Sequence, residues 1–173
     1  MLITSNRQQN YQTTATQSEV VELSPTAHFM LRNRAVWMNT GHGDLLDLWP
    51  EQISSRGSFL IHTTRYPTAI LNTNRIKRPT IGHKYVSLTR SPLFAEYWAD
   101  VTRPDDEGVA AHLILDRTKL QHKYKIEPFN DPWNPSDNLT GRHRHEAEER
   151  IARDIFPLFD VLYGVVVVQN VRG

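Results

Sequence analysis

The sequence predicts a single α+β domain, in which short strands and helices alternate around one sheet. Residues 59–61 are an apolar run of the type found in buried strands, and a strand is predicted over 59–63. Residues 84–90 alternate between polar and apolar side chains, as in a strand with one buried face. Two segments that open with a proline, 67–74 and 92–101, have the features of helices. A chain of 173 residues is long enough for one sizeable core and short for two.

The amino-terminal third carries the weaker patterns. Residues 1–18 are rich in Gln, Asn and Thr, so we expect an extended or disordered arm, followed by one domain over residues 19–173. Ser24 and Pro25 predict a helix over residues 26–36, and a second short helix is expected at 44–48 before Pro50.

The central third gives clearer predictions. The strand at 59–63 is followed by a helix that starts at Pro67 and ends at Asn74, a residue that tolerates the left-handed conformation. In the strand 84–90, one face is predicted to be apolar and the opposite face to be polar. The apolar face consists of Val86 and Leu88, and the polar face of Tyr85, Ser87 and Thr89.

The next helix begins at Ser91-Pro92, and its large apolar residues are expected to pack on the sheet: Leu93, Phe94, Tyr97, Trp98 and Val101. Loops are predicted at 102–108 and 128–142, the second because it holds three prolines and has no regular period. Strands are predicted at 109–115, 124–127 and 164–168.

Composition excludes several classes of protein. The net charge of +1 gives no global field that would favour a nucleic-acid or membrane partner. The absence of cysteine excludes disulfides, thiolate zinc sites and a cysteine nucleophile, and it fits a reducing cytoplasm. The amino terminus has no signal-peptide pattern, and the longest apolar run, 165–168, is too short to span a bilayer. We therefore expect a soluble cytoplasmic protein.

Common catalytic motifs are also missing. His143 and His145 do not have the helical HExxH spacing of a zinc protease, so no metal is expected. No glycine-rich loop precedes a helix, which argues against a P-loop or a dinucleotide-binding fingerprint. Ser87 lies in VSL rather than in G-x-S-x-G, so it does not read as a serine nucleophile.

What remains is an ordered series of polar residues along the predicted strands. It begins with residues 62–65 (HTTR), at the end of the predicted strand 59–63. The alternative explanation for these polar residues is that the strand simply ends in water. It continues on the polar face of the next strand and on the helix after it, and it ends with carboxylates behind a long loop. The members are His62, followed by Thr63 and Thr64, then Tyr85, Ser87, Thr89, Tyr97, Glu146, Glu148 and Glu149.

This series resembles the diphtheria-toxin-like branch of the ADP-ribosyltransferase superfamily, whose His, Tyr and Glu motifs occur in this chain order, over residues 57–170. The resemblance implies a mixed or antiparallel split sheet with flanking helices, and NAD as the substrate. It implies that His62 orients the adenine-side ribose, with Thr63, Thr64 and Ser87 at the NAD site. Tyr85 and Tyr97 would clamp the nicotinamide; eleven residues separate them, one more than in the usual motif.

In this family the catalytic glutamate lies behind a variable loop that recognises the acceptor. Glu148 fits that place, behind the loop 128–142, and Trp133 is the candidate acceptor contact. In a strand, Glu146 and Glu148 share a face, so that Glu146 would handle the acceptor, whereas Glu149 falls on the opposite face. Alternatively, EAEER is the start of a solvated helix with an i,i+4 pair between Glu146 and Arg150.

The expected function is the transfer of ADP-ribose from NAD to a host protein or nucleic acid. A nearby alternative is an enzyme that hydrolyses NAD, or one that removes 2′-phosphates from RNA. An alternative from another class is a phage structural or host-binding module without catalysis. The stretches YVSLTRSPLFA, LILDRTKL, YKIEPFND and EAEERI also resemble a group of phage-encoded proteins, which would place the protein in the cytoplasm of a host cell.

Overall fold

The computed structural model describes residues 21–40, 59–82, 84–101, 110–129 and 148–168. Its described strands form one sheet in the order β1-β7-β4-β2-β3-β6-β5. Only β1 and β7 are parallel; every other neighbouring pair in this order is antiparallel. The strands are β1 (Val36–Thr40), β2 (Phe59–Thr64), β3 (Val86–Thr89), β4 (Ala110–Asp116), β5 (Glu127–Phe129), β6 (Glu148–Ile151) and β7 (Leu162–Val168).

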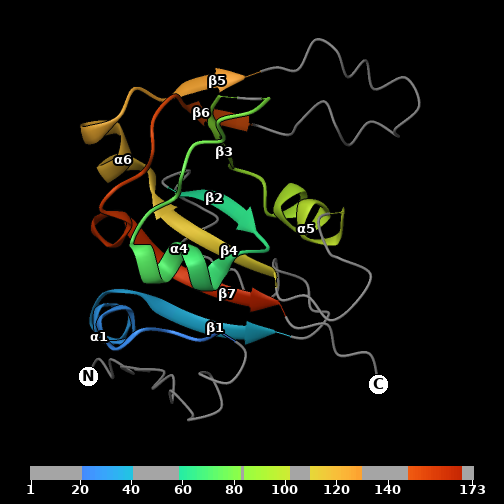
Figure 1. Cartoon of the computed structure of the whole chain (residues 1–173). Coiled ribbons are helices and arrows are strands. Elements are labelled where there is room, and N and C mark those ends of the chain that lie inside the picture. Colours follow the sequence, from blue (N-terminus) through green and yellow to red (C-terminus); the bar gives the residue numbers. More distant parts are fainter. Residues whose placement is uncertain (1–20, 41–58, 83, 102–109, 130–147, 169–173) are drawn as a thin grey trace, which may run out of the picture.

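The sheet has two parts that are joined at a single residue pair. Strands β1, β7, β4 and β2 form a large part, in which β2 and β4 pair continuously from Phe59–Asp116 to Thr64–Ala111. Strands β3, β6 and β5 form a small part, drawn above the large part in Figure 1. The only register pair between β2 and β3 is Ile61 with Thr89. The α+β prediction is confirmed, with helices flanking one mixed, largely antiparallel sheet.

Most of the described helices cover one face of the sheet. These are α1 (Pro25–Arg34), α4 (Pro67–Thr73), α6 (Arg117–Lys123) and the 3₁₀ turn η3 (Leu158–Asp160). They bury Leu31, Leu71, Leu120 and Leu158 against residues of the sheet such as Leu113, and this cluster is the main core. Removal of these side chains from water is the main stabilising contribution to the fold.

The other face of the sheet is covered by α5 (Pro92–Val101), seen at the right of Figure 1. Ala95 packs with Ile61, and Ala99 is buried further along the helix. The prediction that Tyr97 and Trp98 pack on the sheet is wrong, since they are 40% and 42% exposed. Small alanines at i and i+4 let the helix approach the sheet closely. Phe94 is buried as predicted, whereas Tyr97 and Trp98 are partly turned to solvent.

Several element boundaries differ from the prediction. The first helix ends at Arg34, and the following residues form β1 rather than a helical turn. This strand pairs with β7, and a parallel partner so distant in sequence leaves no local pattern. Helix α6 was not predicted; its capping residue is Asp116, whose side chain accepts a hydrogen bond from Lys119 N.

The short strand β5 lies at Glu127–Phe129 rather than at 124–127. Residues 128 and 129 therefore belong to the sheet and not to the predicted loop, whose remaining residues lie outside the described ranges. The arm 1–18, the helix 44–48 and the loop 102–108 also lie outside them. Within the described ranges, every helix is too short or too polar to cross a bilayer.

Candidate functional site

His62 lies where the two parts of the sheet separate. Beyond the pair Ile61–Thr89, Nδ1 of His62 lies 3.1 Å from the backbone carbonyl oxygen of Ser87 on β3. Because a carbonyl oxygen only accepts, Nδ1 carries the proton in this contact. Burial lowers the pKa of the His62 imidazole below its ordinary value, while the hydrogen bond to Ser87 acts in the opposite direction. The neutral ring therefore has Nε2 as an acceptor, which suits a hydroxyl donor such as that of a ribose.

Glu148 lies on β6, directly beside β3. Thr89 pairs with Glu148 and Ser87 with Arg150, so these residues share one face of the small part of the sheet. The Glu148 carboxylate forms an ion pair with Arg150, with Nε and Oε1 separated by 2.9 Å. Only 13% of the Glu148 side chain and 12% of the Arg150 side chain are exposed. The site thus holds its carboxylate in a fixed and largely dry position.

Tyr85 precedes β3, and its ring lies against Arg150, the cation of this ion pair. The Arg150 guanidinium carbon lies 5.6 Å from the centre of the Tyr85 ring, within cation–π range. Val86 and Leu88 are buried in the main core on the opposite side, and Ser87 is exposed. The predicted alternation of β3 is confirmed for these residues, and it places Tyr85 on the face that carries Arg150 and Glu148, next to Arg150.

Glu149 occupies the opposite face of β6 and has different partners. It is 2% exposed, and its carboxylate accepts hydrogen bonds from Arg117 Nε at 3.0 and 3.2 Å. Arg90 Nε lies 3.2 Å from the same carboxylate. Residues 148–151 are therefore a strand, and the helical alternative for EAEER is wrong over its described residues. Glu149 on β6 thus links Arg90, which follows β3, with Arg117 on α6. Glu148 remains as the carboxylate at the candidate site.

The hydroxyls of Thr63 and Thr64 serve contacts within the protein. Thr63 Oγ1 donates to the Ala95 carbonyl oxygen at 3.2 Å and lies 2.9 Å from Nδ1 of His112. Since the hydroxyl proton is used for Ala95, His112 is the donor in the second contact. Thr64 Oγ1 accepts a hydrogen bond from Tyr66 N. These two residues, expected at the NAD site, hold α5 and the turn before α4 in the structure.

Tyr97 lies on the exposed side of α5, where its ring meets Trp98 edge to face with centroids 5.5 Å apart. Glu146 and Trp133 lie outside the described residues, so their proposed roles stay predictions.

Arg150 is the site residue that sequence reasoning missed. It contacts Glu148, lies over Tyr85 and pairs in register with Ser87 on one side and with Glu127 on the other. The spacing Glu148-x-Arg150 could have indicated it, because alternate residues of a strand share a face. The helical interpretation of this segment instead paired Arg150 with Glu146 at i,i+4.

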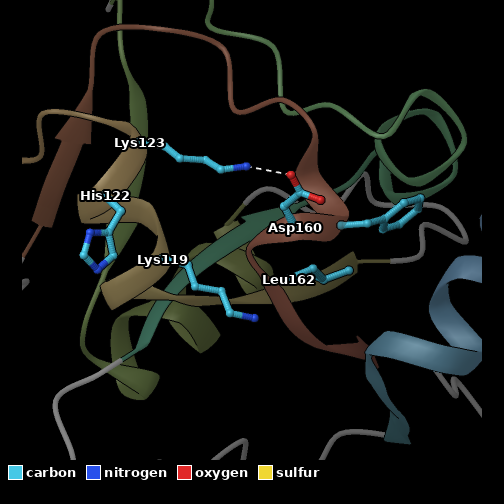
Figure 2. A pocket seen from close by; sticks show the side chains of 6 residues that line it. Lys119, His122, Lys123, Asp160 and Leu162 are labelled. Carbon is cyan, nitrogen blue, oxygen red and sulfur yellow. Dashed lines mark hydrogen bonds and ion pairs between the residues drawn. The ribbon is translucent and has the colours of Figure 1, made fainter.

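A pocket of about 540 Å³ lies elsewhere, between α6 and η3, and it contains none of the predicted site residues (Figure 2). No group of three or more potential metal-binding His, Cys, Asp or Glu residues occurs in the described part of the chain. No protein-family model, curated protein or solved structure matches this sequence. The functional argument therefore depends on the site itself.

Proposed function

We propose that this protein cleaves the bond between nicotinamide and ribose in NAD and transfers the ADP-ribose to a macromolecule. The main support is the convergence of three distant segments at one place in the sheet. His62 contacts the Ser87 carbonyl, and the same strand β3 carries Thr89 directly beside Glu148. By register, Tyr85, Arg150 and Glu148 share one face of the small part, whereas His62 pairs with Leu113 on the face of the main core and reaches β3 through the Ser87 backbone.

These residue types fit the chemistry of glycosidic cleavage. When the bond between ribose C1′ and the nicotinamide nitrogen breaks, its electron pair leaves with the neutral ring and positive charge develops on the ribose. The Glu148 carboxylate would stabilise that charge, and the Tyr85 ring would pack against the leaving nicotinamide. His62 would accept a hydrogen bond from the other ribose. An acceptor nucleophile then bonds to C1′ and gives up its proton, a step for which Glu146 is the candidate base.

Arg150 would act as a positioning residue in this reaction. Its guanidinium holds the Glu148 carboxylate and covers the Tyr85 ring, so it fixes the two groups relative to each other. Its planar fork suits this task better than a lysine ammonium would.

The acceptor, the place of action and the origin of the gene belong to the same proposal. The resemblance to phage-encoded proteins supports a host protein or nucleic acid as acceptor, in the cytoplasm of the host. Trp133 is the proposed contact to that acceptor. If the protein instead only binds a host component, it will release no nicotinamide under any condition.

The test measures nicotinamide release from NAD by the full chain, with bacterial lysate as a source of acceptors. Glu148→Gln should lower the rate at least ~100-fold, equivalent to about 2.7 kcal/mol of transition-state stabilisation. Glu22→Gln is the matched control, because Glu22 is exposed and precedes α1 on another part of the molecule. Melting temperatures of both variants show whether the fold is retained.

The outcomes separate the candidate functions. Release that depends on Glu148 and labels a lysate component with the ADP-ribose of a tagged NAD supports transfer, and release without labelling supports hydrolysis. Equal release by wild type and Glu148→Gln removes Glu148 from the chemistry. Absence of release with every acceptor preparation contradicts the enzyme and leaves the binding module.

A further inference from the structure

Positive charge is concentrated in three segments, although the whole chain is nearly neutral. Residues 75–78, 116–127 and 153–160 together contain eight Lys or Arg and four Asp or Glu, a balance of +4. The net charge of the complete chain is only +1. The remainder of the protein therefore has a net negative charge. This negative charge offsets the local basic region, so the net charge of the whole chain does not reveal it.

Contacts within the protein place these segments side by side. Ile76 and Ile155 form a backbone bridge, and Arg78 N donates to the Asp154 carboxylate at 2.9 Å. The Tyr124 hydroxyl joins the end of α6 to the third segment, since it donates to the backbone oxygen of Phe156 and accepts from its nitrogen. In Figure 1 the two loops and α6 lie on the left of the molecule.

Several cations in these segments remain open to solvent. Lys77, Arg78, Lys119 and Arg153 are exposed, and none of them forms a side-chain ion pair with another residue in the ranges that the structure describes. Lys123 is paired with Asp160 at 2.6 Å, and Lys125 with Glu127 at 2.7 Å. We call the four solvent-exposed cations, together with Arg75 and Phe156, the basic surface.

The pocket between α6 and η3 lies next to this surface. Figure 2 shows Lys119, His122 and Lys123 on one side of it and Asp160 and Leu162 on the other. Phe159 and Leu162 are 5% and 3% exposed, so they line it mainly as apolar floor. The rim carries the Lys123–Asp160 ion pair and Lys119, so Lys119 is the cation there that could meet a phosphate.

Phe156 adds an aromatic group to the same place. It is 49% exposed, and the Arg75 guanidinium carbon lies 4.6 Å from its ring centre. Aromatic rings and arginine planes are the groups on which unpaired bases stack. A site that bound anions through charge alone would not need an aromatic ring.

We propose that the basic surface binds single-stranded nucleic acid. Lys77, Arg78 and Lys119 contact phosphates, and a base stacks on Phe156. A base-paired duplex hides the faces of its bases, so a stacking platform favours a single strand. An acidic peptide would satisfy the cations but make no use of the solvent-exposed part of the Phe156 ring. This inference stands independently of NAD cleavage, because it uses neither Glu148 nor His62.

The test measures fluorescence anisotropy of labelled 20-nucleotide single strands, of RNA and of DNA, with the full chain at several salt concentrations. The triple variant Lys77→Glu/Arg78→Glu/Lys119→Glu should bind at least ~30-fold more weakly, and the dependence of affinity on salt should become clearly shallower. Phe156→Ala should bind about ten-fold more weakly with an unchanged salt dependence, since it removes stacking and no charge.

Arg65→Glu is the matched charge control. Arg65 is exposed and follows the carboxyl-terminal end of β2, whereas α6 adjoins the opposite end, where Phe59 pairs with Asp116. This variant should change affinity less than about three-fold. Equal losses in Arg65→Glu and the triple variant would overturn the proposal, as would equal binding of polyglutamate or of a duplex. Wild-type binding that is undetectable at low salt would overturn it as well.

Discussion

The two parts of the sheet are held together by different forces. In the large part, long strands pair over five or six consecutive positions, and residues such as Leu113, Ile114 and Val165 are completely buried. In the small part, strands of three or four residues carry charges, and Glu148 and Glu149 point to opposite faces with arginine partners on both. Apolar burial stabilises the first part throughout, whereas the second combines the burial of Val86, Leu88 and Ile151 on one face with charge pairing of Glu148 and Glu149.

In the proposed enzyme, this difference would separate stability from chemistry. A carboxylate that is to meet a ligand cannot be buried in an aliphatic core, because removal of its charge from water would cost too much. Short, polar strands at one side of a stable sheet hold such a group without weakening the main core. The single pair between Ile61 and Thr89 then leaves room for His62 between the two parts.

The largest effect on stability is expected in the large part. Leu113 is fully buried in the centre of β4, so Leu113→Ala removes apolar contacts and leaves a cavity. We expect the free energy of unfolding in urea to fall by about 3 kcal/mol. A loss below about 1 kcal/mol would show that this part tolerates cavities and would contradict the comparison.

A smaller effect is expected for the charge cluster of the small part. Glu149→Gln leaves Arg117 and Arg90 without their anion, but these side chains are 30% and 49% exposed and water will partly solvate them. We expect the free energy of unfolding to fall by about 2 kcal/mol.

Salt provides the control for this second prediction. Addition of salt screens the ion pairs, so the difference between wild type and Glu149→Gln should shrink at high ionic strength, while that of Leu113→Ala should not. Equal behaviour of the two variants in salt would mean that both parts are stabilised in the same way.

The smallest effect concerns His62, at the junction. Its pKa is lowered in the folded state, chiefly by burial, so the unfolded chain binds more protons once the pH falls below about 6.5. The stabilisation that the folded state gains by keeping the His62 ring neutral is complete above that pH. It is lost as the pH falls from there toward the folded-state pKa, with a slope of at most about 1.4 kcal/mol per pH unit for one proton.

His62→Gln should remove this part of the pH dependence of stability, measured by urea unfolding between pH 7.5 and 4.5. The exposed His122 gives the matched control, His122→Gln, which should retain it. An NMR titration of the His62 ring that reports a pKa above 6.5 would contradict the burial of this residue between the two sheet parts.

The sequence alone determined the α+β class, the strand at 59–63, the helix that ends at Asn74 and the alternation of β3. These features are local: a proline fixes a first turn, Asn74 adopts φ 52° at a helix end, and a period of two assigns the faces of a strand. The same period correctly placed Glu149 with Ile151 on the face opposite Glu148.

Tertiary structure decided the rest, because it depends on partners that are distant in the chain. No local pattern shows that β1 pairs with β7, that Thr63 holds α5 through Ala95, or that Tyr97 is turned to solvent. The role of Arg150 appears only when β3 and β5 flank β6. The basic surface likewise arises from three separate segments whose charge is cancelled elsewhere in the chain, so that composition conceals it and only folding brings it together.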